Sequence, residues 1–137
     1  MKLTMDDART IAEGIAAEAR VRDVQVSCSV VDARGIEIIT MRMDGAPWFT
    51  PDVARTKART AAVMRQSTAD LARLKEAYPD LISLIDDQLP FTATTLPGGV
   101  VVERDNRVVG GVGVSGAHPD EDIACARAAI DAWIAAS

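Results

Sequence analysis

Apolar residues recur at helical spacing near both ends of the chain. The first stripe predicts a helix that begins after Thr4, where Thr4 and Asp7 form a capping box, and ends near Arg22. The second stripe predicts a helix over residues 119–135, opened by a proline. The stripes consist of Ala8, Ile11, Ala12, Ile15, Ala16 and Ala19, and of Ile123, Ala126, Ile130, Trp133 and Ile134. Each helix should therefore bury one face against the rest of the protein.

Alternating and valine-rich segments predict two β-hairpins. Residues 24–32 and 36–42 form the first, with a turn at Ala33-Arg34-Gly35. In the second, two strands flank a tight turn at Asp105-Asn106.

Sequence signals between residues 50 and 87 predict further helices. Thr50 is expected to cap a helix that runs to about Gln66; a second follows over residues 67–77, and a short turn over 80–87. Residues 91–96 are a loop or a short strand. Hairpins separated by helices indicate an α+β fold, with a central antiparallel sheet of four to five strands flanked by helices.

Glycines are concentrated in and around the second hairpin. Glycine inside a strand weakens it and usually marks a bulge or the close approach of another backbone or a ligand. The cluster therefore predicts a contact surface, with a ligand or a neighbouring subunit as its partner. The glycines are Gly98, Gly99, Gly110, Gly111, Gly113 and Gly116.

Size and charge narrow the class of protein. The 137 residues fit one domain spanning residues 1–137, and the net charge of −5 argues against nucleic acid and anionic membranes as partners. No apolar run approaches the roughly 20 residues of a membrane span, and no signal peptide is evident, so we expect a cytoplasmic protein. One histidine and two cysteines give no metal-site spacing, so no metal is predicted.

Lys57 is the most informative single residue, because it falls in the middle of the apolar face of its predicted helix. Three interpretations are open. The side chain reaches the helix edge, it pairs with a buried carboxylate such as Asp32 or Asp44, or it lines a pocket and meets an anionic ligand.

Three other positions are candidates for ligand contact. Arg42 ends a strand just before a loop that carries Trp48 and Phe49, an arrangement that can hold a carboxylate against a hydrophobic wall. An ordinary Arg–Asp pair beside a loop-anchoring tryptophan explains the same residues. His118 lies between the glycine-serine loop and Pro119, where it is either an ordinary exposed side chain or a ligand.

An ordered set of motifs resembles the GlcG/HbpS/PduO-C-terminal family, also called the haem-degrading-domain family. The motifs are VVDARG from Val30, RMDGA from Arg42, KARTA from Lys57, PGG from Pro97 and GVSG from Gly113. The resemblance implies a profilin-like fold, homo-oligomers from dimers to octamers, and haem as a possible cofactor. Members more usually carry a proline where this chain has Val101. Haem ligation here would fall to His118, to a weak oxygen ligand, or to a methionine such as Met41, Met43 or Met64.

Two functions follow as expectations. The first is a small-molecule-binding protein for haem or another planar anionic ligand. Lys57 and Arg42 would meet its carboxylates, Trp48 or Phe49 would stack on it, and the contacts would be completed by Gly98, Gly99, Ser115 and His118. The second is a small cofactor-independent enzyme acting on an organic acid, with Lys57 as general base or electrostatic stabiliser and Arg42 as the carboxylate clamp. An oligomeric accessory protein without a ligand is a third possibility.

Overall fold

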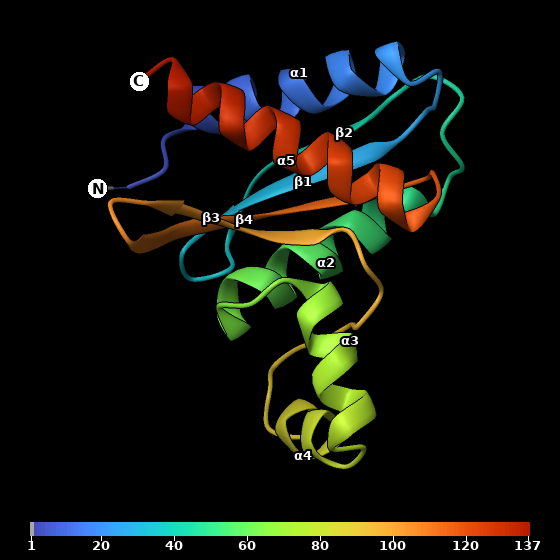
Figure 1. Ribbon diagram of the computed structural model, residues 1–137, viewed down its shortest axis with the longest axis vertical. Helices are drawn as coiled ribbons and strands as arrows, with labels where there is room; N and C mark the ends of the chain where they lie inside the picture. Colours follow the sequence, from blue (N-terminus) through green and yellow to red (C-terminus); the bar gives the residue numbers. More distant parts are fainter. Residues whose placement is uncertain (1) are drawn as a thin grey trace.

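The chain folds into a four-stranded antiparallel sheet with helices on both faces (Figure 1). The computed structural model describes residues 2–137. The strand order is β2-β1-β4-β3, so each predicted hairpin forms and the two are joined through β1 and β4. The elements are α1 (Met5–Val21), β1 (Ser27–Asp32), β2 (Glu37–Arg42), α2 (Thr50–Met64), α3 (Thr68–Ala77), α4 (Leu81–Asp86), β3 (Gly99–Arg104), β4 (Arg107–Ser115) and α5 (Pro119–Ala135). The predicted α+β fold is confirmed, with four strands.

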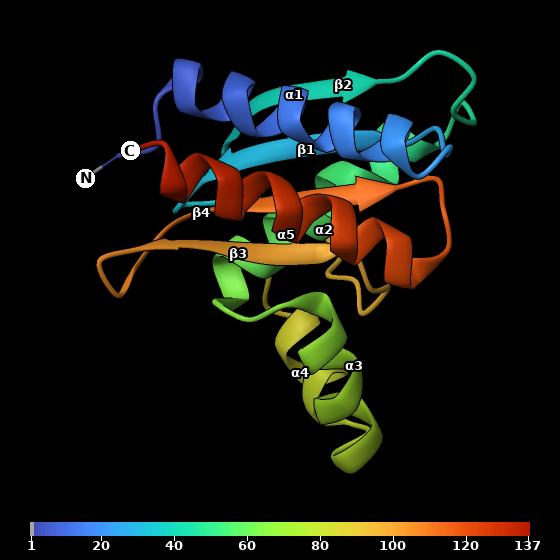
Figure 2. The ribbon, with the colours of Figure 1, turned by 45° about the horizontal axis from the view of Figure 1, so that its top comes forward.

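The two terminal helices cover one face of the sheet. Figure 2 shows α1 and α5 lying side by side across it. Their apolar stripes bury Ile11, Ile15 and Ile130 against valines of β1 and β4. Thr4 and Asp7 form the predicted capping box. This layer is the main hydrophobic core, and both cysteines lie in it as buried, unbridged thiols.

Helix α2 packs on the opposite face, where the strands present small residues. A Cβ atom added to Gly113 would lie 2.0 Å from the carbonyl oxygen of Ala54, and one added to Gly111 would lie 2.5 Å from that of Ala58. Such distances leave no room for a side chain, so the backbone of α2 lies almost directly on the backbone of β4. Gly111 and Gly113 therefore do mark a close contact, but their partner in this fold is the chain's own helix.

Helices α3 and α4 project away from the sheet as an arm (Figure 1). Ser67 caps α3 by accepting a hydrogen bond from the amide of Asp70 at 3.1 Å. The arm is attached through Thr68, whose buried hydroxyl accepts a hydrogen bond from the amide of Gly99 at 2.9 Å. The chain then returns to β3 through residues 91–96, which form a loop and no strand.

The predicted cap of α2 is wrong. Phe49 occupies the cap position and Thr50 is already helical. The Thr50 hydroxyl instead donates to the carbonyl oxygen of Pro47 at 2.7 Å and lies 2.8 Å from the hydroxyl of Ser27 on β1. Thr50 thus ties the start of α2 to the sheet.

No helix among residues 2–137 is long and apolar enough to cross a membrane.

We predict that Gly113→Ala lowers the free energy of unfolding by about 3 kcal/mol or more, because the added methyl group forces α2 off the sheet. Urea unfolding followed by circular dichroism measures this. Gly14→Ala is the matched control: its methyl group meets the Cβ atom of Ala129 at 3.1 Å, and the better helix propensity of alanine offsets that contact. Equal losses for the two variants would contradict the close-contact explanation.

Candidate functional site

Lys57 lies on the face of α2 that meets the sheet, and its side chain is only 5% exposed. Its Nζ atom donates to the carbonyl oxygen of Val114 at 2.8 Å and lies 3.5 Å from Oδ2 of Asp122. The interpretation of Lys57 as one half of a buried ion pair is therefore right, but the carboxylate is not Asp32 or Asp44. Asp32 accepts backbone hydrogen bonds within its own turn, and Asp44 is exposed.

Asp122 is fixed in the first turn of α5 and is only 2% exposed. Its Oδ1 atom accepts a hydrogen bond from the amide of Ala117 at 3.1 Å, which leaves Oδ2 directed at Lys57. Asp122 is not among the residues predicted for the site, because an acidic residue in the first turn of a helix ordinarily complements the helix dipole. Helical spacing holds the signal that sets it apart. Asp122 precedes Ala126 and Ile130 by one and two turns, so it continues the buried stripe of α5.

Burial shifts the pKa of both members of the pair. It lowers the pKa of the Lys57 ammonium, and the nearby carboxylate offsets only part of this effect. It raises the pKa of Asp122 to about 6, although Lys57 and the amide of Ala117 both favour the ionised form. A carboxyl group that titrates near neutrality can act as a proton donor and acceptor at physiological pH.

A pocket of about 340 Å³ opens beside this ion pair. Its polar lining includes Lys57, Ser115 and Asp122, and the carbon-rich walls come from α2 and from the loops before α2, before β3 and before α5. The wall side chains include Pro47, Phe49, Val53, Leu96, Pro97 and Pro119. A buried charge pair in the wall of a largely apolar hollow matches the general pattern of small-molecule sites.

The structure brings several predicted ligand-binding residues to this pocket. Phe49 and Ser115 line it together with Lys57. Trp48 is 82% exposed and packs edge-on against Phe49, with ring centroids 6.0 Å apart. His118 lies between two lining residues and caps α5, because its Nδ1 atom accepts a hydrogen bond from the amide of Asp120 at 3.3 Å. The imidazole is exposed, and its Nε2 atom takes no part in the cap.

Other predicted residues lie elsewhere. Arg42 does not line this pocket; it borders a separate hollow and donates from Nη1 to the carbonyl oxygen of Ala46 at 2.9 Å. Gly98 and Gly99 lie behind Lys57 rather than on the pocket wall. A Cβ atom at Gly98 would lie 2.8 Å from Nζ of Lys57, and one at Gly99 would lie 2.6 Å from its carbonyl oxygen. These glycines make room for the lysine.

We predict that Asp122→Asn changes the pH dependence of stability. The raised pKa means that folded Asp122 keeps its proton between about pH 4 and pH 6, where the unfolded chain has lost it. The free energy of unfolding of the unchanged protein therefore falls as pH rises through this range, by up to about 2 kcal/mol from this group. Asparagine cannot ionise. The free energy of unfolding of the variant minus that of the unchanged protein should therefore become more positive from pH 4 to pH 7.

Urea unfolding at a series of pH values measures this difference. Asp120→Asn is the control, because it removes a carboxylate from the same helical turn whose side chain is 90% exposed. The free energy of unfolding of Asp120→Asn should differ from that of the unchanged protein by a nearly constant amount across the pH series. A difference for Asp122→Asn that becomes more negative with pH would mean that attraction to Lys57 outweighs burial.

Comparison with known proteins places the chain in a family. The family model described as haem degrading protein HbpS-like matches residues 3–131. The chain is 32% identical over 130 residues to the corrinoid adenosyltransferase PduO of Salmonella typhimurium, covering 95% of this chain but only 38% of PduO. It therefore corresponds to well under half of that relative.

Solved structures agree with the sequence match. A complex of PduOC with haem has a TM-score of 0.84 at 29% identity, covering 96% of this chain and 95% of that one. A double mutant of HbpS from Streptomyces reticuli has a TM-score of 0.85 at 32% identity, covering 96% and 87% of the two chains. The motifs, the fold and these matches coincide, and the chain belongs to the HbpS-like family.

Proposed function

We propose that this protein binds a small molecule with an apolar body and an anionic group in the pocket beside Lys57 and Asp122, and that haem is its ligand. The observation that carries the proposal is the buried ion pair that lines a largely apolar pocket. The haem complex of the related PduOC supports the choice of ligand.

The residues around the pocket have the chemical character that haem binding requires. The walls formed by Phe49, Val53 and Leu96 match an apolar macrocycle, and the ammonium group of Lys57 suits a propionate. Haem is larger than the 340 Å³ pocket, so part of the macrocycle would lie over the exposed rim, where Trp48 adds aromatic surface. Bound haem would supply a redox-active iron centre, whose reactivity would depend on the protein groups that hold it.

We expect haemin to shift its Soret band on titration with the protein, and Val53→Trp to weaken this binding about tenfold or more. Val53 is a half-buried wall residue of α2, and the larger ring would fill the pocket. A tenfold loss corresponds to about 1.4 kcal/mol of binding free energy.

Leu84→Trp is the matched control for this titration. It adds the same indole at a position on α4 that is 60% exposed and does not line the pocket, so haemin affinity should not change. Equal effects of the two substitutions, or no saturable shift of the Soret band at micromolar protein, would count against the proposal.

His118 is the chain's single histidine, and its imidazole is proposed as the group that would hold the haem iron. The test uses two substitutions, because His118 also caps α5. Asparagine is a good helix cap and alanine is not, so His118→Asn keeps the cap while removing the imidazole. If His118 ligates iron, both variants should move the Soret maximum of the complex. A spectrum altered by His118→Ala but unchanged by His118→Asn would assign the effect to the cap alone.

An enzyme that transfers a proton to or from an organic acid is the second candidate. The pKa of about 6 for Asp122 favours it, with Asp122 as the titrating group and Lys57 as the electrostatic stabiliser. Arg42 is not a wall residue of the pocket, so the carboxylate clamp expected from the sequence has no support here.

The oligomeric state and the cytoplasmic location stay predictions. Exposed apolar side chains on the α3–α4 arm, among them Tyr78, Leu81 and Leu84, are consistent with contact between copies of the chain.

A further inference from the structure

A second hollow, of about 460 Å³, shares no lining residue with the Lys57 pocket. It lies between α2, the turn that joins β1 to β2, and the loop at Phe91 and Thr92. Three charged side chains line it: Glu37 from β2, and Arg55 and Arg59 from α2. The two arginines have very different surroundings.

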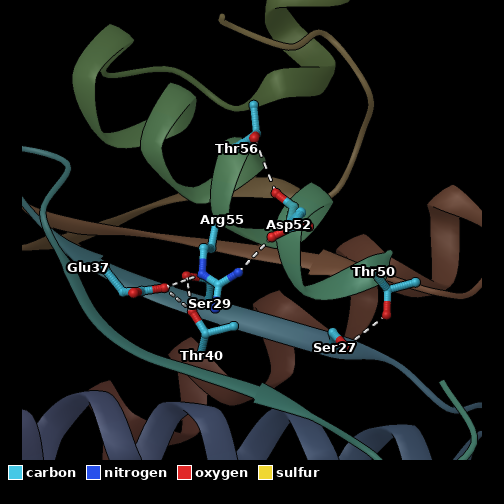
Figure 3. A network of polar contacts seen from close by, with 8 residues as sticks. All are labelled: Ser27, Ser29, Glu37, Thr40, Thr50, Asp52, Arg55 and Thr56. Carbon is cyan, nitrogen blue, oxygen red and sulfur yellow. Dashed lines mark hydrogen bonds and ion pairs between the residues drawn. The ribbon is translucent and has the colours of Figure 1, made fainter. Parts of the chain in front are cut away.

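Arg55 is already neutralised by two carboxylates. Its Nε atom lies 2.5 Å from Oε2 of Glu37, and its Nη1 atom lies 2.8 Å from Oδ1 of Asp52 (Figure 3). The hydroxyl of Thr40 lies 2.5 Å from the same Glu37 oxygen and so helps to fix that carboxylate. Little of the charge of Arg55 therefore remains for a ligand.

Arg59 has no such compensation. Its guanidinium carbon lies 4.2 Å from the centroid of the Phe91 ring, and its stem packs against Gly35, where a Cβ atom would lie 3.1 Å from Cγ. The side chain is thus held in place by stacking and packing. Its Nε atom is buried without a hydrogen-bond acceptor, and within residues 2–137 no carboxylate lies at ion-pair distance from Arg59.

A buried donor on a charged group is costly to leave unsatisfied. Here Arg59 is the side chain that incurs this cost, and it borders a hollow. Its neighbour Arg55 is already paired with carboxylates. An oxyanion in the hollow would supply both the missing negative charge and the missing acceptor, since a guanidinium group matches a carboxylate with paired hydrogen bonds.

We propose that this hollow is a second ligand site, which binds the carboxylate of a small monocarboxylic acid at Arg59. Two observations favour a monoanion with an apolar body. Glu37 and Asp52 together carry one negative charge more than Arg55 compensates, which opposes a dianion, and Val31, Ile36 and Phe91 provide apolar surface. The site is independent of the Lys57 pocket, so a failure to bind haem would not affect this proposal.

Sodium benzoate is the probe, titrated into the full protein against sodium chloride at equal ionic strength. The readout is the Nε–Hε resonance of Arg59 in a proton–nitrogen correlation spectrum, assigned by its loss in Arg59→Met. We expect a saturable shift of this resonance. Shifts of the backbone amides of Gly35 and Phe91 should give the same affinity.

Arg59→Met keeps an unbranched side chain to pack on Phe91 but removes the guanidinium group. It should lower benzoate affinity about tenfold or more, the effect of losing a charge-assisted hydrogen bond. Arg59→Lys keeps the charge without the planar fork and should lower affinity less. Arg73→Met removes one positive charge from an exposed position on α3 and should leave affinity unchanged.

Three results would overturn the proposal. The first is a failure of benzoate to bind at Arg59, seen either as no saturable shift in unchanged protein or as the same benzoate affinity in Arg59→Met. The second is tighter binding of inorganic phosphate than of benzoate, which would exclude a monocarboxylate site. The third is an Arg59 resonance that responds to protein dilution instead of benzoate, which would mean that a second copy of the chain supplies the acceptor.

Discussion

The direct contact between the backbones of α2 and β4 is the constraint on which the rest of the structure depends. Gly111 and Gly113 permit it on the strand, and Ala54, Ala58 and their small neighbours permit it on the helix. Side chains of ordinary size would hold the two layers farther apart. Because the helix lies so close, polar side chains that it carries reach groups of the sheet and of the loops around it.

Lys57 shows the consequence most clearly. Gly98 and Gly99 leave space for it, so its amine reaches the last strand residues and meets Asp122 at the start of α5. The pair is nearly free of solvent, which disfavours both charges and raises the pKa of the acid to about 6. A buried pair of this kind is weak evidence for stability, since desolvation offsets much of the attraction. Its position beside a pocket makes function the better explanation.

The same helix displays cations in contrasting states. Lys57 is paired with Asp122, Arg55 is held between Glu37 and Asp52, and Arg59 is stacked on Phe91 without an acceptor for its buried nitrogen. Packing fixes the place of each side chain, whereas the neighbouring loops and strands decide whether its charge is satisfied. A single amphipathic helix thereby borders two pockets of different chemistry.

Local patterns in the sequence determined the elements, and the ordered motifs determined the family. Helical stripes, the Thr4 capping box and two turn-centred hairpins predict nearly every element, because these signals depend on residues close together in the chain. Only the tertiary structure decided that Asp122 is the partner of Lys57, that Arg42 lies away from their pocket, and that the glycines accommodate a helix. These outcomes depend on which faces meet once β1 pairs with β4 and α2 docks on the sheet, and such contacts join residues that the sequence keeps far apart.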